Sequence, residues 1–287
     1  MRILILGATG MLGSAVLISL QKNENFDVWA TLRNTKSNFF YNQSKLIHNI
    51  DVLDQDSLIG VFEKIKPNLV INCIGLIKQL AHAKDPLCVL PINSIFPHRL
   101  AKLCSLSNAR LIHFSTDCVF SGKKGNYTES DSSDADDLYG KSKFIGEVTD
   151  LSHVLTLRTS IIGHEINTNY ALINWFLSQN QTVKGFVKAI YTGLPTFELA
   201  RVIQNYVIPN PNLSGLYHVA TKPINKHDLL NLVAETYGKK ITIIPDDQVK
   251  IDRSLNAVRF NKETGYIPPE WPKLIEVMHQ SQKLYRG

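Results

Sequence analysis

Short apolar runs alternate with amphipathic stretches through the first 160 residues of the chain. Residues 2–6 are apolar and lead into a glycine-rich turn, and residues 11–21 then have the apolar spacing of a helix. The alternation continues in strands predicted at 26–32, 45–50, 69–74, 110–115 and 154–158 and in helices predicted at 57–66, 95–106 and 138–149. This order predicts an α/β fold with a doubly wound parallel sheet, joined by right-handed crossovers.

The regular alternation of predicted strands and helices ends after about residue 160. The later residues predict helices at 170–178, 196–206, 226–237 and 274–283, a strand at 215–219 and a turn cluster at 209–215. We therefore expect residues 1–160 to form one domain. Residues 161–287 would form mainly a smaller C-terminal lobe, with some segments returning to the first sheet.

Composition narrows the class of protein. The chain has 287 residues, of which 44% are hydrophobic and 20% charged, as is ordinary for a globular protein. No apolar run approaches the ~20 residues of a membrane span, and the first run is too short for a signal peptide. The four cysteines have no C-x-x-C spacing, so we expect reduced thiols in the cytoplasm and neither disulfides nor a metal site.

The net charge of +6 comes from basic residues scattered along the chain, without a basic run interleaved with aromatics. This pattern argues against a nucleic-acid partner. A mild positive surplus suits an anionic small substrate equally well, because it raises the local substrate concentration. The acidic stretch at 131–137 is interpreted as a solvated loop.

Three glycines with G-x-x-G-x-x-G spacing follow the first predicted strand, at Gly7, Gly10 and Gly13. Such glycines allow a sharp turn, a close approach of the backbone to a pyrophosphate, and tight packing of the helix on the sheet. The phosphates then lie against free N–H groups at the helix N-terminus. The flanking strand and helix predict a Rossmann-type dinucleotide site. Its contacts in this loop would be Gly7, Thr9, Gly10, Met11 and Leu12.

The end of the second predicted strand should contact the adenosine ribose of the cofactor. No carboxylate stands there to accept a bond from a 2′-hydroxyl, whereas Arg33 can pair with a 2′-phosphate. The sequence therefore favours NADP over NAD, with NADPH as the reduced form. Asp51 and Val52 are placed to meet the adenine, and Cys73, Ile74 and Gly75 to pass close to the ribose and nicotinamide.

Tyr139 and Lys143 are four residues apart on a predicted helix and so share one face. A free tyrosine titrates near ~10, and a neighbouring ammonium, together with the positive nicotinamide of an oxidised cofactor, would lower that pKa. Lys143 could also bind ribose hydroxyls, and Ser115 and Tyr139 are expected to contact the cofactor as well. Ser115 or Thr116, at the end of the fifth predicted strand, could hold a carbonyl oxygen. Together these groups predict a proton donor and a polarising hydrogen bond around one reacting oxygen.

Several segments resemble the extended short-chain dehydrogenases/reductases, and most closely the dTDP-4-dehydrorhamnose reductase family. Residues 112–122 resemble that family's S-T-D-Y-V-F-x-G segment, and residues 139–147 its Y-G-x-[ST]-K-x-x-G-E segment. Weaker likenesses lie at 125–129, 157–163 and 215–219. The resemblance implies an NADPH-dependent reductase of the 4-keto group of a nucleotide-linked 6-deoxy-4-ketohexose, in polysaccharide and O-antigen synthesis. Thr116 would bond the carbonyl, Tyr139 would donate the proton, and Lys143 would hold the ribose.

Two departures from the family lie at the expected substrate edge. Cys118 stands where the family usually has tyrosine, and residues 74–79 differ from its small-residue A-A-Y-T stretch. The substrate could therefore be a UDP-linked 2-acetamido-4-keto sugar. The C-terminal lobe would supply further contacts. The expected substrate-binding residues are Lys78, Thr116, Asp117, Cys118, Val119, His164, Trp175 and Arg253.

Two other functions stay open at this point. One is a 4-epimerase or dehydratase of the extended family, against which Arg33 argues because epimerases usually have a small acidic or neutral ribose reader. The other is a non-catalytic NADP-binding subunit, such as the one that associates with methionine adenosyltransferase and resembles the same family. A homodimer is a candidate assembly.

Overall fold

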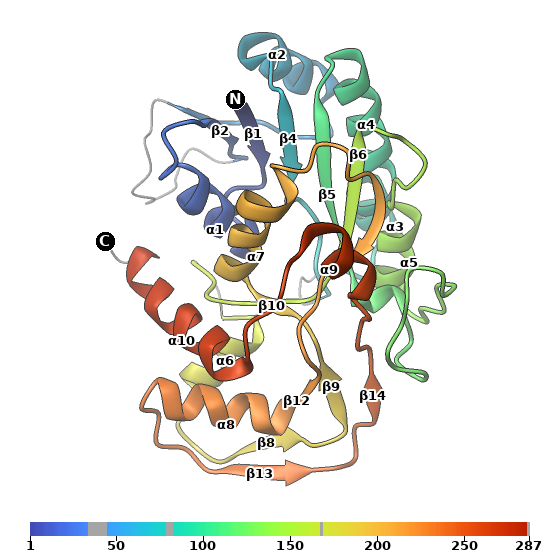
Figure 1. Cartoon of the computed structure of the whole chain (residues 1–287). Coiled ribbons are helices and arrows are strands. Elements are labelled where there is room, and N and C mark those ends of the chain that lie inside the picture. Colours follow the sequence, from blue (N-terminus) through green and yellow to red (C-terminus); the bar gives the residue numbers. More distant parts are fainter. Residues whose placement is uncertain (34–44, 79–82, 167–168, 286–287) are drawn as a thin grey trace.

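The computed structural model describes residues 1–33, 45–78, 83–166 and 169–285. Its centre is a seven-stranded sheet in the order β11-β6-β5-β4-β1-β2-β3, in which every neighbouring pair is parallel (Figure 1). The predicted α/β fold is confirmed. The strands are β1 (Arg2–Leu6), β2 (Asp27–Thr31), β3 (Leu46–Ile47), β4 (Leu69–Asn72), β5 (Arg110–Thr116), β6 (Val154–Thr159) and β11 (Gly215–His218).

Helices cover both faces of this sheet because both faces are apolar. Ile3 and Ile5 of β1 belong to one core cluster, whereas Leu4 and Leu6 belong to another. The first cluster lies under α1 (Met11–Leu20) and α7 (Thr196–Val202), which pack against each other. The second lies under α2 (Gln55–Ile65) and α4 (Phe96–Leu106). Successive strand residues point to opposite faces, so a continuous apolar run fits a strand buried on both sides.

The helical segment before β5 is longer than predicted. It begins with α3 (Pro86–Leu90), passes through the π-helical turn η2 (Pro91–Ile95), and continues as α4. The sequence predicts only residues 95–106, because prolines normally mark helix boundaries. Here Pro86, Pro91 and Pro97 each lie in the first two positions of their segment, where a missing N–H costs little. Such π-helical turns are frequent at functional sites.

The second half of the chain adds helices and three small sheets, and β8, β9, β12, β13 and β14 lie below the main sheet in Figure 1. The small sheets pair β10 with β7, β12 with β9 and β14, and β13 with β8. Each of these strands has only two to four residues, too few for a clear alternation, and the sequence pattern did not predict them. These strands are β7 (Ile161–Ile162), β8 (Val183–Phe186), β9 (Ala189–Tyr191), β10 (Leu194–Pro195), β12 (Ile224–Asn225), β13 (Ile243–Asp246) and β14 (Ile251–Asp252).

Helices of the second half pack on one another and on neighbouring strands. The remaining helical segments are η3 (Asp117–Val119), α5 (Leu138–Ile145), α6 (Leu172–Ser178), η4 (Ile203–Val207), α8 (Lys226–Thr236), α9 (Val258–Thr264), α10 (Trp271–Ser281) and η5 (Gln282–Tyr285). Helix α10 contacts α7 and α8. β11 returns to the main sheet by pairing with β6. Among the helices that the structure describes, none has the length and apolar character needed to cross a membrane.

Candidate active site

The glycine turn after β1 has the geometry of a phosphate-binding loop. Gly7 has a φ of +82°, which a side chain would strain. A Cβ atom on Gly13 would lie 2.2 Å from the Gly7 carbonyl oxygen, so only glycine lets α1 start this close to the turn. Gly10 is the exposed N-cap of α1, and among the described residues no side chain caps this helix. Thr9 is exposed, Met11 half-buried and Leu12 buried in the core.

The other predicted cofactor residues also follow the carboxyl ends of strands. Arg33 is exposed two residues after β2. Asp51 accepts a hydrogen bond from the Leu53 N–H at 3.0 Å in the turn before α2. Val52 packs against the core beneath α2. These positions form one edge with the glycine turn, since β1, β2 and β4 are adjacent and parallel. The residues after β4 are Cys73 and Ile74, both half-buried, and the exposed Gly75.

Helix α5 reaches the site because two of its glycines allow close packing. A Cβ atom on Gly140 would lie 2.1 Å from the Cys118 carbonyl oxygen, and one on Gly146 would lie 1.9 Å from that of Asn93. Asp137 caps the helix, with Oδ1 accepting the Gly140 N–H at 2.7 Å. The helix is thereby fixed between η3 and η2. This packing explains why the resemblance motif carries glycine at both positions.

Lys143 lies on α5 with its ammonium buried beneath the end of β5. Its Nζ donates a hydrogen bond of 2.6 Å to the Phe114 carbonyl oxygen, and the residue is 5% exposed. Burial lowers the pKa of Lys143 to about 8, while the nearby Glu147 acts in the opposite direction. The ammonium is therefore still mostly charged at neutral pH.

Tyr139 and Thr116 form the predicted proton-donor pair, and in the protein alone the pKa of Tyr139 is not lowered. Burial raises the pKa of Tyr139 above its ordinary value, and a hydrogen-bond contribution from Thr116 opposes that shift only in part. Lys143 does not offset this rise, and its Nζ is bound to the backbone of β5. The phenol is therefore protonated at neutral pH in the protein alone. This is the form that a proton donor requires.

Ser115 and Thr116 had been equivalent candidates for holding a carbonyl oxygen, and the structure separates them. Ser115 donates its hydroxyl to Glu147 Oε1 at 2.6 Å. Glu147 in turn pairs with Arg158 through two bonds of 2.7 and 2.6 Å, and both side chains are 3% exposed. Thr116 accepts the Cys118 N–H at 3.1 Å and donates to Asp117 at 3.1 Å. The hydroxyl beside Tyr139 is thus that of Thr116, and Ser115 belongs to the buried ion pair.

Four of the predicted substrate residues converge on one side of Tyr139. The guanidinium of Arg253 lies 3.8 Å from Cys118 Sγ and also donates to the Phe120 carbonyl oxygen at 2.7 Å. Lys78 lies over the Tyr139 ring, with its ammonium 5.4 Å from the ring centroid. Asp117 is buried, and burial raises the pKa of its carboxyl group. The place expected for a family tyrosine is therefore bordered by two cations.

The other three predicted substrate residues lie in different surroundings. Val119 is fully buried in a small apolar cluster with Phe120 and Tyr127, so we correct its role to core packing beneath the site. His164 is buried, and its Nε2 lies 2.8 Å from the hydroxyl of Tyr237 at the end of α8. Trp175 lies on α6 and is 39% exposed. A substrate role for His164 and Trp175 stays a prediction.

Asn93 is a further residue of the site that the sequence pattern did not indicate. This buried residue of η2 exchanges two hydrogen bonds with the Leu76 backbone, of 2.9 and 3.0 Å, and donates to Ser142 Oγ at 3.2 Å. It thus joins the loop after β4 to the helix that carries Tyr139. A buried polar residue within an apolar helical run was the only available signal, and it does not specify a partner.

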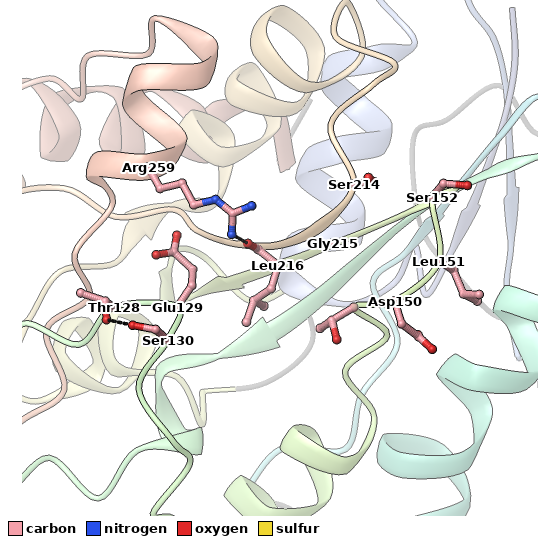
Figure 2. A pocket seen from close by; sticks show the side chains of 11 residues that line it. Thr128, Glu129, Ser130, Asp150, Leu151, Ser152, Ser214, Gly215, Leu216 and Arg259 are labelled. Atoms are coloured by element: carbon pink, nitrogen blue, oxygen red, sulfur yellow. Dashed lines mark hydrogen bonds between the residues drawn. The ribbon is translucent and has the colours of Figure 1, made fainter.

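A wide depression lies elsewhere, at the amino ends of β6 and β11 (Figure 2). It encloses about 750 Å³ and is lined mainly by hydroxyl and charged side chains. Arg259 reaches across it to the Leu216 carbonyl oxygen at 3.0 Å. None of the predicted site residues lines it. Within the described ranges, no three His, Cys, Asp or Glu side chains gather in a way that could hold a metal ion.

Comparison with known proteins places the chain in a family. The model of the RmlD substrate binding domain matches residues 1–278. A dTDP-4-dehydrorhamnose reductase from Aggregatibacter actinomycetemcomitans is 27% identical over 77% of this chain and 74% of its own length. Methionine adenosyltransferase 2 subunit beta from Danio rerio is 26% identical over 83% of this chain and 74% of its own.

The fold has the same relatives. The crystal structure of dTDP-4-dehydrorhamnose reductase from Bacillus anthracis, in complex with NADP, superposes with a TM-score of 0.79. It covers 98% of this chain and 99% of that one at 19% identity. The chain therefore belongs to the RmlD substrate binding domain family.

Proposed function

We propose that the protein is a cytoplasmic NADPH-dependent reductase of the 4-keto group of a nucleotide-linked 6-deoxy-4-ketohexose, in cell-surface polysaccharide or O-antigen synthesis. The observation that carries this proposal is the meeting of Thr116 and a protonated Tyr139 at the end of β5, on the same sheet edge as the glycine turn. The family and the similar reductase agree with it.

The glycine turn fits a dinucleotide. Its first-turn N–H groups start at an exposed glycine, and within the described residues no acidic side chain lies in the first turn of α1 to repel a phosphate. We infer that this turn holds the pyrophosphate and that Arg33 pairs with a 2′-phosphate. The bound nicotinamide would supply the hydride.

The chain's own residues would then polarise the carbonyl oxygen of the substrate and donate a proton to it. The Thr116 hydroxyl turns from Asp117 to the substrate carbonyl oxygen and polarises it. As the carbonyl carbon accepts a hydride, the oxygen gains negative charge and takes the proton from the Tyr139 hydroxyl. Lys143 would orient the ribose hydroxyls of the cofactor. A carbonyl, one hydride and one proton together give the alcohol.

The division of the chain follows from these roles. We infer that residues 1–160 bind NADP and carry the proton chemistry, whereas residues 161–287 mainly bind the sugar nucleotide. Arg253 belongs to the second part but contacts η3 of the first, which supports a substrate site at their junction. A diphosphate is one group that its guanidinium could pair with.

A non-catalytic NADP-binding subunit is the second candidate function. The observation in its favour is the similarity to methionine adenosyltransferase 2 subunit beta, which extends over most of this chain. Against it stands the intact set of Thr116, Tyr139 and Lys143. Binding of NADPH without turnover of any keto sugar, together with binding to a methionine adenosyltransferase, would favour this candidate.

The test of the proposed function is NADPH consumption over a panel of dTDP-, UDP-, GDP- and CDP-linked 4-keto sugars. We expect at least one 6-deoxy-4-keto sugar to be reduced, and Tyr139→Phe to abolish that signal. Absence of turnover across the panel would contradict a reductase. Tightly retained NAD in the purified protein would instead support an epimerase.

The same assay can identify the sugar. Cysteine at position 118 leaves space that a tyrosine would fill, so we expect Cys118→Tyr to harm a UDP-linked 2-acetamido-4-keto substrate more than a plain 6-deoxy-4-ketohexose. The ratio of kcat/KM for the two substrates, measured in both proteins, reports this difference in transition-state binding. An unchanged ratio would mean that position 118 does not set substrate choice.

A further inference from the structure

Lys78 contacts the predicted proton donor, and the proposed proton transfer gives it no role so far. It comes from the loop after β4 and lies over the Tyr139 ring, with its ammonium 5.4 Å from the centroid. The same ammonium forms a 2.6 Å ion pair with Asp137 Oδ2. The two side chains are 33% and 48% exposed, so this pair lies at the rim of the site.

Both partners of the pair are held in place by other contacts. The Oδ1 atom of Asp137 caps α5, so one carboxylate anchors both Lys78 and the helix that carries Tyr139. On the other side, Asn93 fixes the Leu76 backbone, two residues before Lys78, through two hydrogen bonds. The ammonium is therefore connected to the proton donor through defined contacts on two elements.

We propose that Lys78 is a positioning residue for Tyr139: with Asp137 as its counter-ion, it holds the phenol ring and sets how readily the hydroxyl gives up its proton. The inference rests on the proposed function, because it refines the proton-donating step. A cation over an aromatic face is attracted to the ring electrons. That attraction grows as the phenol loses its proton, so Lys78 favours the phenolate. Asp137 has the opposite effect, because its charge raises the pKa of Tyr139.

The other groups around Tyr139 come from three further places. Thr116, Asp117 and Cys118 lie at the end of β5 and in η3, Lys143 lies one turn further along α5, and Arg253 lies beyond Cys118. Asp117 and Cys118 raise the pKa of Tyr139, as burial does. The tests below leave all five groups unchanged, so a shift reports on Lys78 and Asp137.

The test uses two substitutions with opposite expected signs. Lys78→Met removes the cation, and we expect the alkaline limb of the kcat profile for reduction to move up by about half to one pH unit. Asp137→Asn removes the anion but keeps an oxygen that can cap α5, and this limb should move down. The alkaline limb of the double variant should lie close to that of the unmutated protein. Lys78→Arg keeps the cation, so its profile should also resemble that of the unmutated protein.

Lys188→Met is the matched control, because Lys188 pairs with Asp247 at 2.8 Å on the exposed surface of the second lobe. It should leave the profile unchanged. Thermal melting of every variant checks the fold. If Lys78 and Asp137 only support the loop, both variants should have lower rates without opposite shifts of the alkaline limb. Shifts of the same sign in Lys78→Met and Asp137→Asn, or shifts in neither, would therefore overturn the proposal.

A second readout does not depend on turnover. The protein is labelled with 3-fluorotyrosine, the Tyr139 resonance is assigned with Tyr139→Phe, and its titration is followed by ¹⁹F NMR in the same variants. Opposite shifts in this titration without reduction of any keto sugar would contradict the proposed function and support the role of Lys78. Turnover without opposite shifts would do the reverse.

Discussion

The polar side chains at the two ends of the main sheet differ in their surroundings and in their pKa values. At the amino end, the depression beside β11 is wide, and two of its charged side chains, Arg259 and Glu129, have partners within the protein. Arg259 lies 4.3 Å from the Tyr217 ring centroid and donates to the Leu216 carbonyl oxygen, and Glu129 accepts the His218 N–H at 2.8 Å. At the carboxyl end, burial lowers the pKa of Lys143 and raises the pKa of Tyr139. Both shifts favour the uncharged form of the side chain.

The difference shows that the size of a concavity does not mark the chemistry of this protein. Burying an ionisable group costs free energy, and a fold keeps such groups where their reactivity is needed or where an ion pair compensates. The carboxyl end contains both cases. Tyr139 and Lys143 have altered acidity, whereas Glu147 and Arg158 neutralise each other. The predictions below test this contrast from the largest expected effect to the smallest.

The largest effect should come from Tyr139→Phe. The substitution removes the proton donor but keeps the ring under Lys78, so turnover should fall by ~10² to 10⁴ with NADPH affinity nearly unchanged. Steady-state kinetics and a fluorescence titration with NADPH measure the two quantities. Turnover equal to that of the unmutated protein would show that the donor lies elsewhere.

Glu147→Gln tests whether the buried pair is structural. Removing one charge leaves Arg158 buried without its counter-ion, and the free energy of unfolding should fall by about 3–5 kcal/mol. Chemical denaturation measures this change. Glu270→Gln is the matched control, because Glu270 pairs with Lys222 on the surface with side chains 66% and 65% exposed. That loss should stay below about 1 kcal/mol, and equal losses would refute the assignment.

Arg33→Ala tests whether Arg33, at the same edge of the sheet, gives the protein its preference for NADPH. A charge-assisted bond to a 2′-phosphate contributes about 1.5–3 kcal/mol, so the preference for NADPH over NADH should fall by about 10- to 100-fold. Dissociation constants for both cofactors give the ratio. Equal affinities in the unmutated protein would contradict the assignment of NADP before any substitution is made.

The smallest effect should come from Arg259→Met at the amino end. The side chain loses its contact with the Tyr217 ring and its bond to Leu216, so stability should fall by about 1 kcal/mol. The value of kcat/KM should stay within about twofold of the unmutated protein. A tenfold loss would mean that the depression takes part in the reaction and would end the contrast between the two sheet ends.

The main sheet could be predicted from sequence because its strands are continuous apolar runs and its helices have clear periodicity. The glycine turn, Tyr139 and Lys143 could be predicted from spacing. The short strands β7 to β10 and β12 to β14 could not, because two to four residues carry no period. Spacing also cannot give protonation states. In the protein alone, burial raises the pKa of Tyr139, and spacing could not show this burial.

Contacts between segments distant in the sequence could not be predicted either. Asn93, Lys78 and Asp137 lie in three separate parts of the chain, and only the packing of η2, the loop after β4 and the start of α5 brings them together. The glycines at 140 and 146 were visible as part of a motif. Their reason, close approach to the backbone of Cys118 and Asn93, required the structure.

Hydrogen–deuterium exchange with and without NADPH tests most directly the claim that the carboxyl end of the sheet is the active site. We predict protection of the segments around Gly7 to Gly13, Cys73 to Lys78 and Tyr139 to Lys143. The segments that line the depression, at 128–130, 149–152 and 214–216, should exchange at unchanged rates. Protection confined to the depression, with none at the glycine turn, would contradict the account.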